Sequence, residues 1–169
     1  MKGFIFGVIL TLAAVTAGGI AYLWLGLADF RGDEPRSEIE TYIVRNAVHA
    51  SIKRNAPELR SPVPPTDLNL TTGGRMYQEQ CARCHGSSGR QESEHAQGAL
   101  AASELAKEYT ESQIFWIAKH GIRWTGMPAS DAADSDAELW ALAAYIKRLN
   151  HLPPHVKDEL AKLSTSTSN

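Results

Sequence analysis

A run of 25 residues without a charged side chain, residues 4–28, limits what this chain can fold into more than any other feature of its sequence. About 20 predominantly apolar residues allow a helix to cross the hydrocarbon core of a bilayer. A cleaved signal peptide has an apolar core of only about 7–15 residues, and this run continues well beyond residues 15–17, which could serve as a cleavage site. A buried helix of a soluble core rarely runs this long without a polar face. We therefore expect residues 1–28 to be an uncleaved transmembrane anchor that contacts membrane lipid through residues 4–28.

The charges on either side of this run predict its orientation. Lys2 and the α-amino group precede it, whereas the charged side chains that follow it nearly cancel one another. Positive charge favours the cytoplasmic side of a membrane helix. Residues 29–169 are therefore expected on the opposite, outer side of the membrane.

The charge balance and the cysteine count exclude two classes of protein. The chain has 17 basic and 19 acidic side chains, so its formal net charge at pH 7 is −2. A nucleic-acid-binding protein normally carries a basic excess on one face, so no nucleic-acid partner is expected. The chain has 2 cysteines, which cannot form the framework of a multi-disulfide scaffold.

Residues 29–66 are expected to form an amphipathic helix followed by a proline-rich linker. Ser37 and Glu40 have the spacing of a capping box, which opens a helix, and Pro57 ends it. The prolines of residues 61–66 favour a stiff, extended spacer. One face of the helix is apolar and the other carries charges that are interpreted as solvated surface: Ile39, Ile43, Ala47 and Ala50 on the first face, and Arg45, Lys53 and Arg54 on the second.

Residues 67–152 have the pattern of a small all-α domain. We expect one helix over about 71–84, one that opens with the capping box 110–113 and ends at Gly121, and one from the capping box 135–138 to Leu149. No alternating strand pattern occurs there. Three short helices give a thin hydrophobic core, so we expect a cofactor to complete it. The C-terminal tail, 153–169, is expected to form one short helix.

Both cysteines lie in the motif Cys81-Ala82-Arg83-Cys84-His85. On a helical turn this spacing places the two sulfur atoms on one side and the imidazole beside them. That arrangement suits a haem joined by two thioether bonds, with His85 as an iron ligand. A thioredoxin-like dithiol normally lies in a βαβ pattern, which the sequence lacks, and a zinc site needs further ligands nearby. A structural disulfide would not require His85.

A haem iron held by His85 has either a sixth ligand or an open position, and Met127 is the expected ligand. It lies in Gly126-Met127-Pro128, where glycine lets the backbone approach the ring and proline fixes the direction of the chain. Core packing is the commoner use of methionine, but a loop between glycine and proline is poorly suited to it. Other methionines and histidines are less well placed, with His95 and His120 the next ligands to consider: Met1, Met76, His49, His95, His120, His151 and His155.

Residues 70–150 resemble a small class I cytochrome c, the monohaem type with His/Met ligation, and the flanks resemble its membrane-anchored bacterial relatives. The likeness rests on the attachment motif, on the spacing Gly73-x-x-x-Tyr77-x-x-x-Cys81 before it, and on the segments 114–117, 121–129 and 138–140. It implies a class I cytochrome c-like haem domain over residues 67–152. In that fold Gly73 and Tyr77 would meet the third helix, near Leu142 and Tyr145.

The same resemblance implies the cofactor and its surroundings. One covalently attached haem c, with its iron, would be bound by Cys81, Cys84, His85 and Met127. The sequence departs from the family in having no proline in residues 86–127, so another carbonyl, such as one in residues 98–100, is expected to orient the His85 ring. The side chains expected to bury the haem or bond its propionates are Leu100, Trp116, Ile122, Arg123 and Trp124.

Together these expectations describe a one-electron carrier rather than an enzyme, tethered to a bacterial inner membrane with its haem domain in the periplasm. Its partners would be redox proteins: a dehydrogenase or quinol-oxidising complex upstream, and an oxidase or reductase downstream. Two alternatives remain open. One is an open-coordinate haem enzyme or sensor. The other is a haem subunit of a larger oxidoreductase complex that uses the 37–56 helix as a docking surface.

Overall fold

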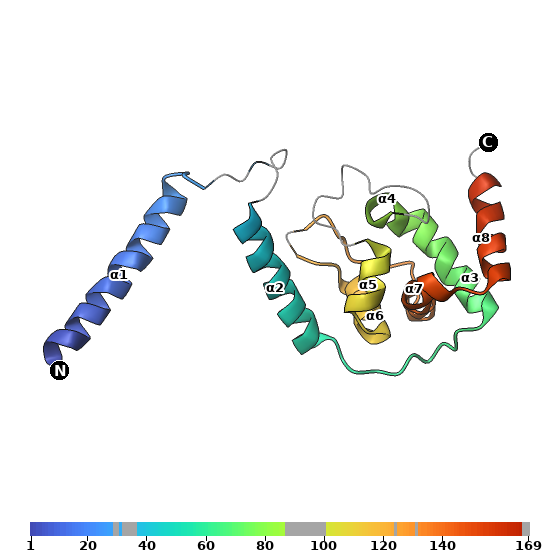
Figure 1. Cartoon of the computed structure of the whole chain (residues 1–169), viewed down its shortest axis with the longest axis horizontal. Helices are drawn as coiled ribbons and strands as arrows, with labels where there is room; N and C mark the ends of the chain where they lie inside the picture. Colours follow the sequence, from blue (N-terminus) through green and yellow to red (C-terminus); the bar gives the residue numbers. More distant parts are fainter. Residues whose placement is uncertain (29–30, 32–36, 87–100, 124, 131, 167–169) are drawn as a thin grey trace. The chain divides into compact units, whose positions relative to one another are not determined.

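The computed structural model describes residues 1–28, 31, 37–86, 101–123, 125–130 and 132–166 (Figure 1). The chain divides into two compact units, Met1–Arg36 and Ser37–Asn169. Every regular element in the described ranges is helical, which confirms the all-α class predicted from the sequence.

The first unit is dominated by one helix, α1, Lys2–Trp24. Its 23 residues give a length of about 35 Å, enough for a hydrocarbon layer of about 30 Å. Its large apolar side chains are exposed on every side, and none of its residues is buried in protein. By length and composition α1 is therefore a candidate membrane span.

The second unit is a bundle of short helices. Its elements are α2 (Glu38–Asn55), α3 (Asp67–Met76), the π-helical turn η1 (Tyr77–Cys81), α4 (Ala82–His85), α5 (Ala102–Glu108), α6 (Glu111–His120), α7 (Asp136–Arg148), the 3₁₀ turn η2 (Leu149–His151) and α8 (Pro154–Ser166).

Three of these helices begin where the capping-box patterns predict. The hydroxyl groups of Ser37, Thr110 and Ser135 each accept a hydrogen bond from the third residue of α2, α6 and α7, and the side chain of that residue accepts one in return. Gly121 ends α6 with φ +62°, as its expected role as a C-cap requires. Reciprocal bonds of this kind satisfy backbone donors that a helix leaves free at its start.

Two helix predictions for residues 67–152 were incomplete. The helix expected over 71–84 begins earlier, at Asp67, where the Thr66 hydroxyl accepts a hydrogen bond from the Asn69 amide. Helix α5 was not predicted at all. It has 7 residues and its N-cap, Ala101, makes no side-chain cap bond, so neither helical periodicity nor a capping signal could reveal it.

The core of the second unit is organised around the crossing of α3 and α7. A Cβ atom placed on Gly73 would overlap the backbone carbonyl of Ala141, so only glycine allows this approach. One turn further on, the rings of Tyr77 and Tyr145 lie 5.6 Å apart. These contacts confirm the helix crossing that the resemblance implied.

Two other helices pack onto this pair. The ring of Phe115 on α6 stacks on Trp140 of α7, with centroids 4.2 Å apart and planes 6° apart. From the C-terminal helix α8, Val156 and Leu160 are buried in the same core cluster as α3 and α7. The C-terminal segment therefore contributes directly to the hydrophobic core.

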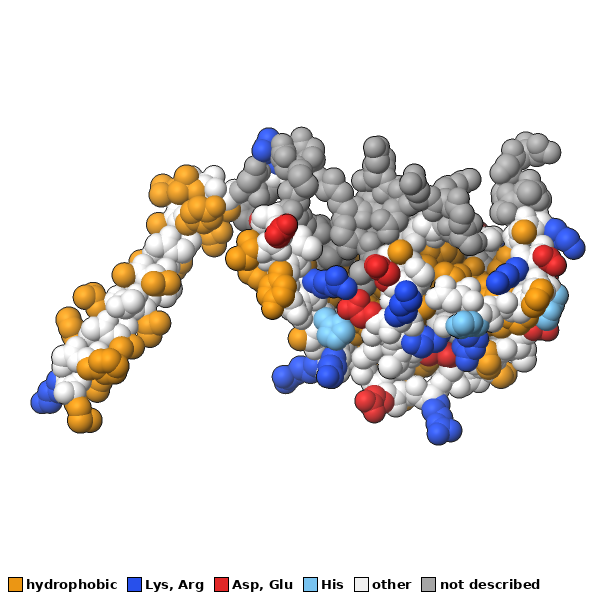
Figure 2. Space-filling view, in the orientation of Figure 1, with side chains coloured by type: hydrophobic (Ala, Val, Ile, Leu, Met, Phe, Trp, Pro, Cys, Tyr) orange, Lys and Arg blue, Asp and Glu red, His pale blue; other side chains and the backbone are white. Residues whose placement is uncertain are grey.

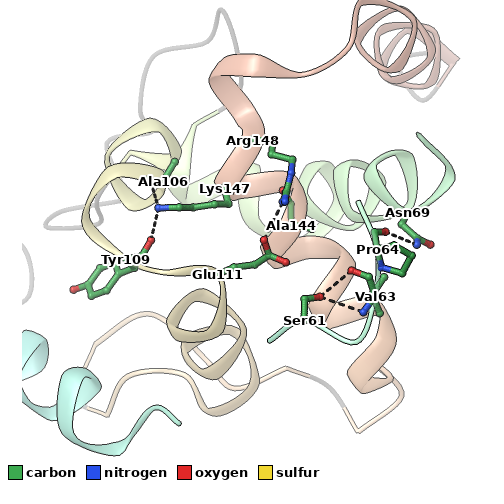
Figure 3. A network of polar contacts seen from close by, with 10 residues as sticks. All are labelled: Ser61, Val63, Pro64, Asn69, Ala106, Tyr109, Glu111, Ala144, Lys147 and Arg148. Atoms are coloured by element: carbon green, nitrogen blue, oxygen red, sulfur yellow. Dashed lines mark hydrogen bonds and ion pairs between the residues drawn. The ribbon is translucent and has the colours of Figure 1, made fainter. Parts of the chain in front are cut away.

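The C-terminal end of α7 holds the turn between α5 and α6 in place (Figure 3). The Lys147 ammonium donates to the carbonyl oxygens of Ala106 and Tyr109, at 2.7 and 2.9 Å. The Arg148 guanidinium donates to the Glu111 carboxylate at 2.9 Å. On the opposite side of α7 in the same view, the Asn69 amide donates to the Pro64 carbonyl and ties the proline-rich linker to α3. These bonds join separate elements, and helix propensity along the sequence does not predict them.

Helix α2 packs through a different face from the one that the sequence pattern indicated. Ile52 is 2% exposed and lies in the core cluster, whereas Ile39 and Ile43 are exposed. Arg45, interpreted from the sequence as solvated surface, pairs with Glu108 at 3.1 Å. The helix has two apolar faces, and the periodicity of the sequence selected the one that does not pack.

The neighbouring glycines of α3 give a matched test of the α3–α7 crossing. A Cβ on Gly73 meets the Ala141 backbone, which cannot move alone, whereas a Cβ on Gly74 meets side-chain ends of Leu160 and Tyr145. Gly73→Ala should therefore lower the free energy of unfolding by about 3 kcal/mol, the upper part of the range for overpacked cores. Gly74→Ala should lower the free energy of unfolding by less than half as much. Urea denaturation of the two variants measures the difference. Equal losses would contradict the close crossing.

Candidate functional site

The sequence motif of residues 81–85 forms a tight turn at the end of α3. The π-helical turn η1 ends at Cys81, and the short helix α4 carries Cys84 and His85. The Tyr77 hydroxyl donates a hydrogen bond to the carbonyl of Gly86. This bond joins the start of η1 to the residue that follows α4 and so closes the turn. Burial raises the pKa of Tyr77 above its ordinary value, so the hydroxyl keeps its proton and remains a donor. We call residues 81–86 the attachment turn.

The two cysteines are partly buried, and no disulfide joins their sulfur atoms. Burial raises the pKa of the Cys81 thiol to about 11, and the nearby Asp134 carboxylate acts in the same direction. A dithiol that acts in redox exchange usually has a lowered thiol pKa, set by positive charge or by a helix N-terminus. The surroundings of Cys81 therefore do not favour the thioredoxin-like alternative.

Residues 121–123 and 125–130, which follow α6, turn back on the end of that helix. The Ile122 amide donates to the Met127 carbonyl, and the Ser130 amide donates to the Ala118 carbonyl, both at 3.1 Å. The Thr125 hydroxyl donates to the Ile122 carbonyl at 2.7 Å and accepts from the Met127 amide at 3.2 Å. We call this loop the Met127 strap, because these bonds fix the backbone on both sides of that residue.

Gly121 sets the position of the strap. Its φ is +62°, and a Cβ atom there would lie 2.5 Å from the carbonyl carbon of Pro128 and from the amide nitrogen of Ala129. Only a glycine therefore lets the strap lie against the end of α6. The ion pair between Lys119 and Asp136, at 2.6 Å, ties the same end of α6 to the start of α7.

The attachment turn and the Met127 strap border the same hydrophobic cluster. Side chains from both lie at its edge, partly buried, together with residues of α5 and α6: Cys81, Ala82, Leu105, Trp116, Ile122 and Met127. The attachment turn contributes two thiols and an imidazole, the strap contributes a thioether, and apolar side chains beside them are half-buried. A haem requires that donor set and an apolar surface of that kind, so the residues present fit the group.

The other candidate ligands of the sequence analysis have different surroundings. Met76 is buried in the core, and Met1 is exposed at the start of α1. His120 is exposed at the end of α6, with its ring 5.0 Å from that of Trp116. His49 and His155 pair with the carboxylates of Glu108 and Asp67, and His151 is exposed in η2. Four predictions fall outside the described residues: His95, Leu100, Trp124 and the carbonyls of 98–100.

Two residues that shape the site were not singled out as such by the sequence analysis. Gly121 was expected to end α6, but its close approach to Pro128 depends on a loop conformation that no sequence pattern specifies. Thr125 braces the strap through a hydroxyl that both donates and accepts. The sequence Thr125-Gly126-Met127 is only a weak signal of such a brace, because threonine hydroxyls are common in loops.

Comparison with known proteins identifies the domain. Residues 68–146 match the family model described as cytochrome c oxidase, cbb3-type, subunit III. These residues belong to the cytochrome c family. The match confirms the cytochrome c family that the sequence indicated, and the cytochrome c domain indicates haem-based electron transfer. Neither the curated proteins nor the solved structures contained a match to this chain.

Two glycines of the strap test its geometry. Gly121→Ala places a Cβ against Pro128 at a positive φ, and should lower the free energy of unfolding by about 1–3 kcal/mol. Gly126→Ala is the control, because a Cβ there meets nothing within 4 Å and its φ is not positive. Urea unfolding of both variants should show a large effect at 121 and a small one at 126. A neutral Gly121→Ala would show that the strap does not rest on α6.

Proposed function

We propose that this protein is a membrane-tethered one-electron carrier with a single, covalently attached haem c. The observation that supports the proposal is the match of residues 68–146 to a cytochrome c family model, together with the packing of the attachment turn and the Met127 strap against one hydrophobic cluster. The bound haem would supply an iron that cycles between Fe(II) and Fe(III).

Each site residue has a distinct role in this proposal. Cys81 and Cys84 bind the porphyrin through thioether bonds, and His85 binds the iron from the attachment turn. Met127 binds the iron from the strap, where the hydrogen bonds of Ile122 and Thr125 hold its backbone. With an imidazole and a thioether as its two side-chain ligands, the iron would have a raised reduction potential and no free position for peroxide or oxygen. A carrier, rather than an open haem enzyme or sensor, follows from that ligand pair.

The rigid surroundings of both ligands suit electron transfer. The attachment turn is closed by the Tyr77 hydroxyl, and the strap is fixed to α6 by backbone bonds. Ligands held in this way move little when the iron changes oxidation state, so little reorganisation accompanies transfer. Redox proteins are the partners that fit, with a dehydrogenase or quinol-oxidising complex as donor and an oxidase or reductase as acceptor.

Helix α1 would hold the carrier in the inner membrane of a bacterium. It is long and apolar enough to span the bilayer, and Lys2 at its start favours a cytoplasmic N-terminus. The cytochrome c domain would then lie in the periplasm. This tether confines the search for partners to the membrane plane.

A second candidate function is favoured by the description of the matching family. That description names a subunit of an oxidase, and so supports a haem subunit of a larger oxidoreductase complex. The proposed roles of Cys81, Cys84, His85 and Met127 are the same in both cases. The two candidates differ in whether the chain purifies alone or with permanent partner chains.

Met127→Ala tests the ligand assignment, with Met76→Leu as its matched control. Met127→Ala should keep the haem on the chain, because the two cysteines hold it, but it should shift the ferric spectrum from low spin to high spin. It should also lower the reduction potential and allow carbon monoxide to bind. Met76→Leu changes a buried methionine by a volume-conserving substitution and should leave all three properties unchanged.

Absorption spectra, a redox titration and a carbon monoxide titration of the three proteins measure these effects. Wild type that already binds carbon monoxide, or a Met127→Ala variant with an unchanged spin state and potential, would contradict the carrier proposal. His120→Ala would then identify the next ligand to consider.

A further inference from the structure

The first two turns of α2 expose large apolar side chains that no other described part of the chain covers. Ile39, Tyr42 and Ile43 are 67%, 69% and 59% exposed. In Figure 2 hydrophobic side chains gather over this end of α2, whereas the other end of the helix is packed against α6. Ordinary surface helices of a soluble domain expose polar side chains here, so this patch requires an explanation.

The exposed apolar side chains form one stripe along the start of α2. At about 100° per residue, Tyr42, Ile39 and Ile43 lie within about 100° of the helix circumference, and the exposed Glu40 separates them from Val44. An apolar stripe beside polar side chains is the pattern of an amphipathic helix that lies in the plane of a lipid interface.

The covalent connection to α1 keeps this patch near any membrane that α1 spans. Helix α1 ends at Trp24 and α2 begins at Glu38, so residues 25–37 join them. At about 3.3–3.6 Å per residue, those 13 residues reach no further than about 45 Å, and the apolar run itself extends to residue 28. The effective concentration of lipid at the patch is therefore high, and weak apolar contacts suffice to hold it.

The charges on α2 fit the same arrangement. Glu40 at its start is engaged in the capping box with Ser37, at 2.8 Å. Arg45 is directed to Glu108 on the packed face, and exposed Lys53 and Arg54 lie at the far end of the helix. The first two turns carry the acidic side chains of Glu38 and Glu40 and no basic one, so contact with lipid there is apolar rather than electrostatic. Salt should weaken it little.

We propose that residues 38–44 of α2 insert into the headgroup region of the phospholipid bilayer that holds α1. This second contact fixes the orientation of the cytochrome c domain above the membrane, because α2 is packed on α6, the helix that ends at the Met127 strap. The inference rests on the membrane tether of the proposed function.

Photocrosslinking in the full-length holoprotein tests this contact. Tyr42→p-benzoylphenylalanine replaces one exposed aromatic side chain by another, and Leu68→p-benzoylphenylalanine is the control, since Leu68 is an equally exposed apolar residue, 76%, on α3. Each protein is reconstituted into vesicles of phosphatidylcholine and phosphatidylglycerol, washed at alkaline pH, illuminated and analysed by mass spectrometry.

Phospholipid adducts at position 42 should exceed those at 68 by at least fivefold, and the double change Ile39→Ser and Ile43→Ser should reduce them to the level at 68. Equal yields at the two positions, or a crosslink from position 42 to a second copy of the chain, would overturn the inference. Loss of the protein from the vesicles in the alkaline wash would overturn the tether and the inference together. Retention without adducts at 42 would overturn the inference alone.

Discussion

The contact between Gly73 on α3 and the backbone of Ala141 on α7 sets the helix crossing against which α6 and α8 pack. Without a side chain at that point, the two helices approach closely enough for Tyr77 and Tyr145 to pack one turn further along. The continuation of α3 then delivers the attachment turn to one end of this crossing. Helix α7 presents Trp140 to α6, which carries the Met127 strap at its end. Both halves of the proposed haem site are therefore positioned by one helix crossing.

The hydrophobic core explains why a bound group is expected to matter for stability as well as for redox chemistry. The helices are short, between 4 and 18 residues in the second unit, and much of the apolar surface at the site is only partly buried. A small core of this kind supplies little net stability by itself. A large apolar ring between the attachment turn and the strap would cover side chains such as Trp116 and Ile122. In this account the cofactor completes the core, and the core in turn keeps both iron ligands in place.

Much of this structure could be predicted from sequence, and the failures have physical causes. The capping boxes predicted the starts of α2, α6 and α7, because they depend on a local hydrogen-bond pattern that spans four residues. Helix α5 was missed because two turns without a cap give almost no periodic signal. The prediction of which face of α2 packs was wrong, because the helix has two apolar faces. The choice between Ile43 and Ile52 depends on which of them α6 can reach. Cys81 and Met127 pack against one core cluster, but the approach of Gly121 to Pro128 is a tertiary contact that local patterns do not encode.

The intact mass of the protein under denaturing conditions tests the central claim most directly. Full-length protein should be produced in a bacterium able to attach haem, then unfolded and measured without reduction. We expect the mass of the polypeptide plus one haem, because thioether bonds to Cys81 and Cys84 survive unfolding. The mass of the polypeptide alone, or a mass lower by two hydrogen atoms from a disulfide between the cysteines, would contradict the account.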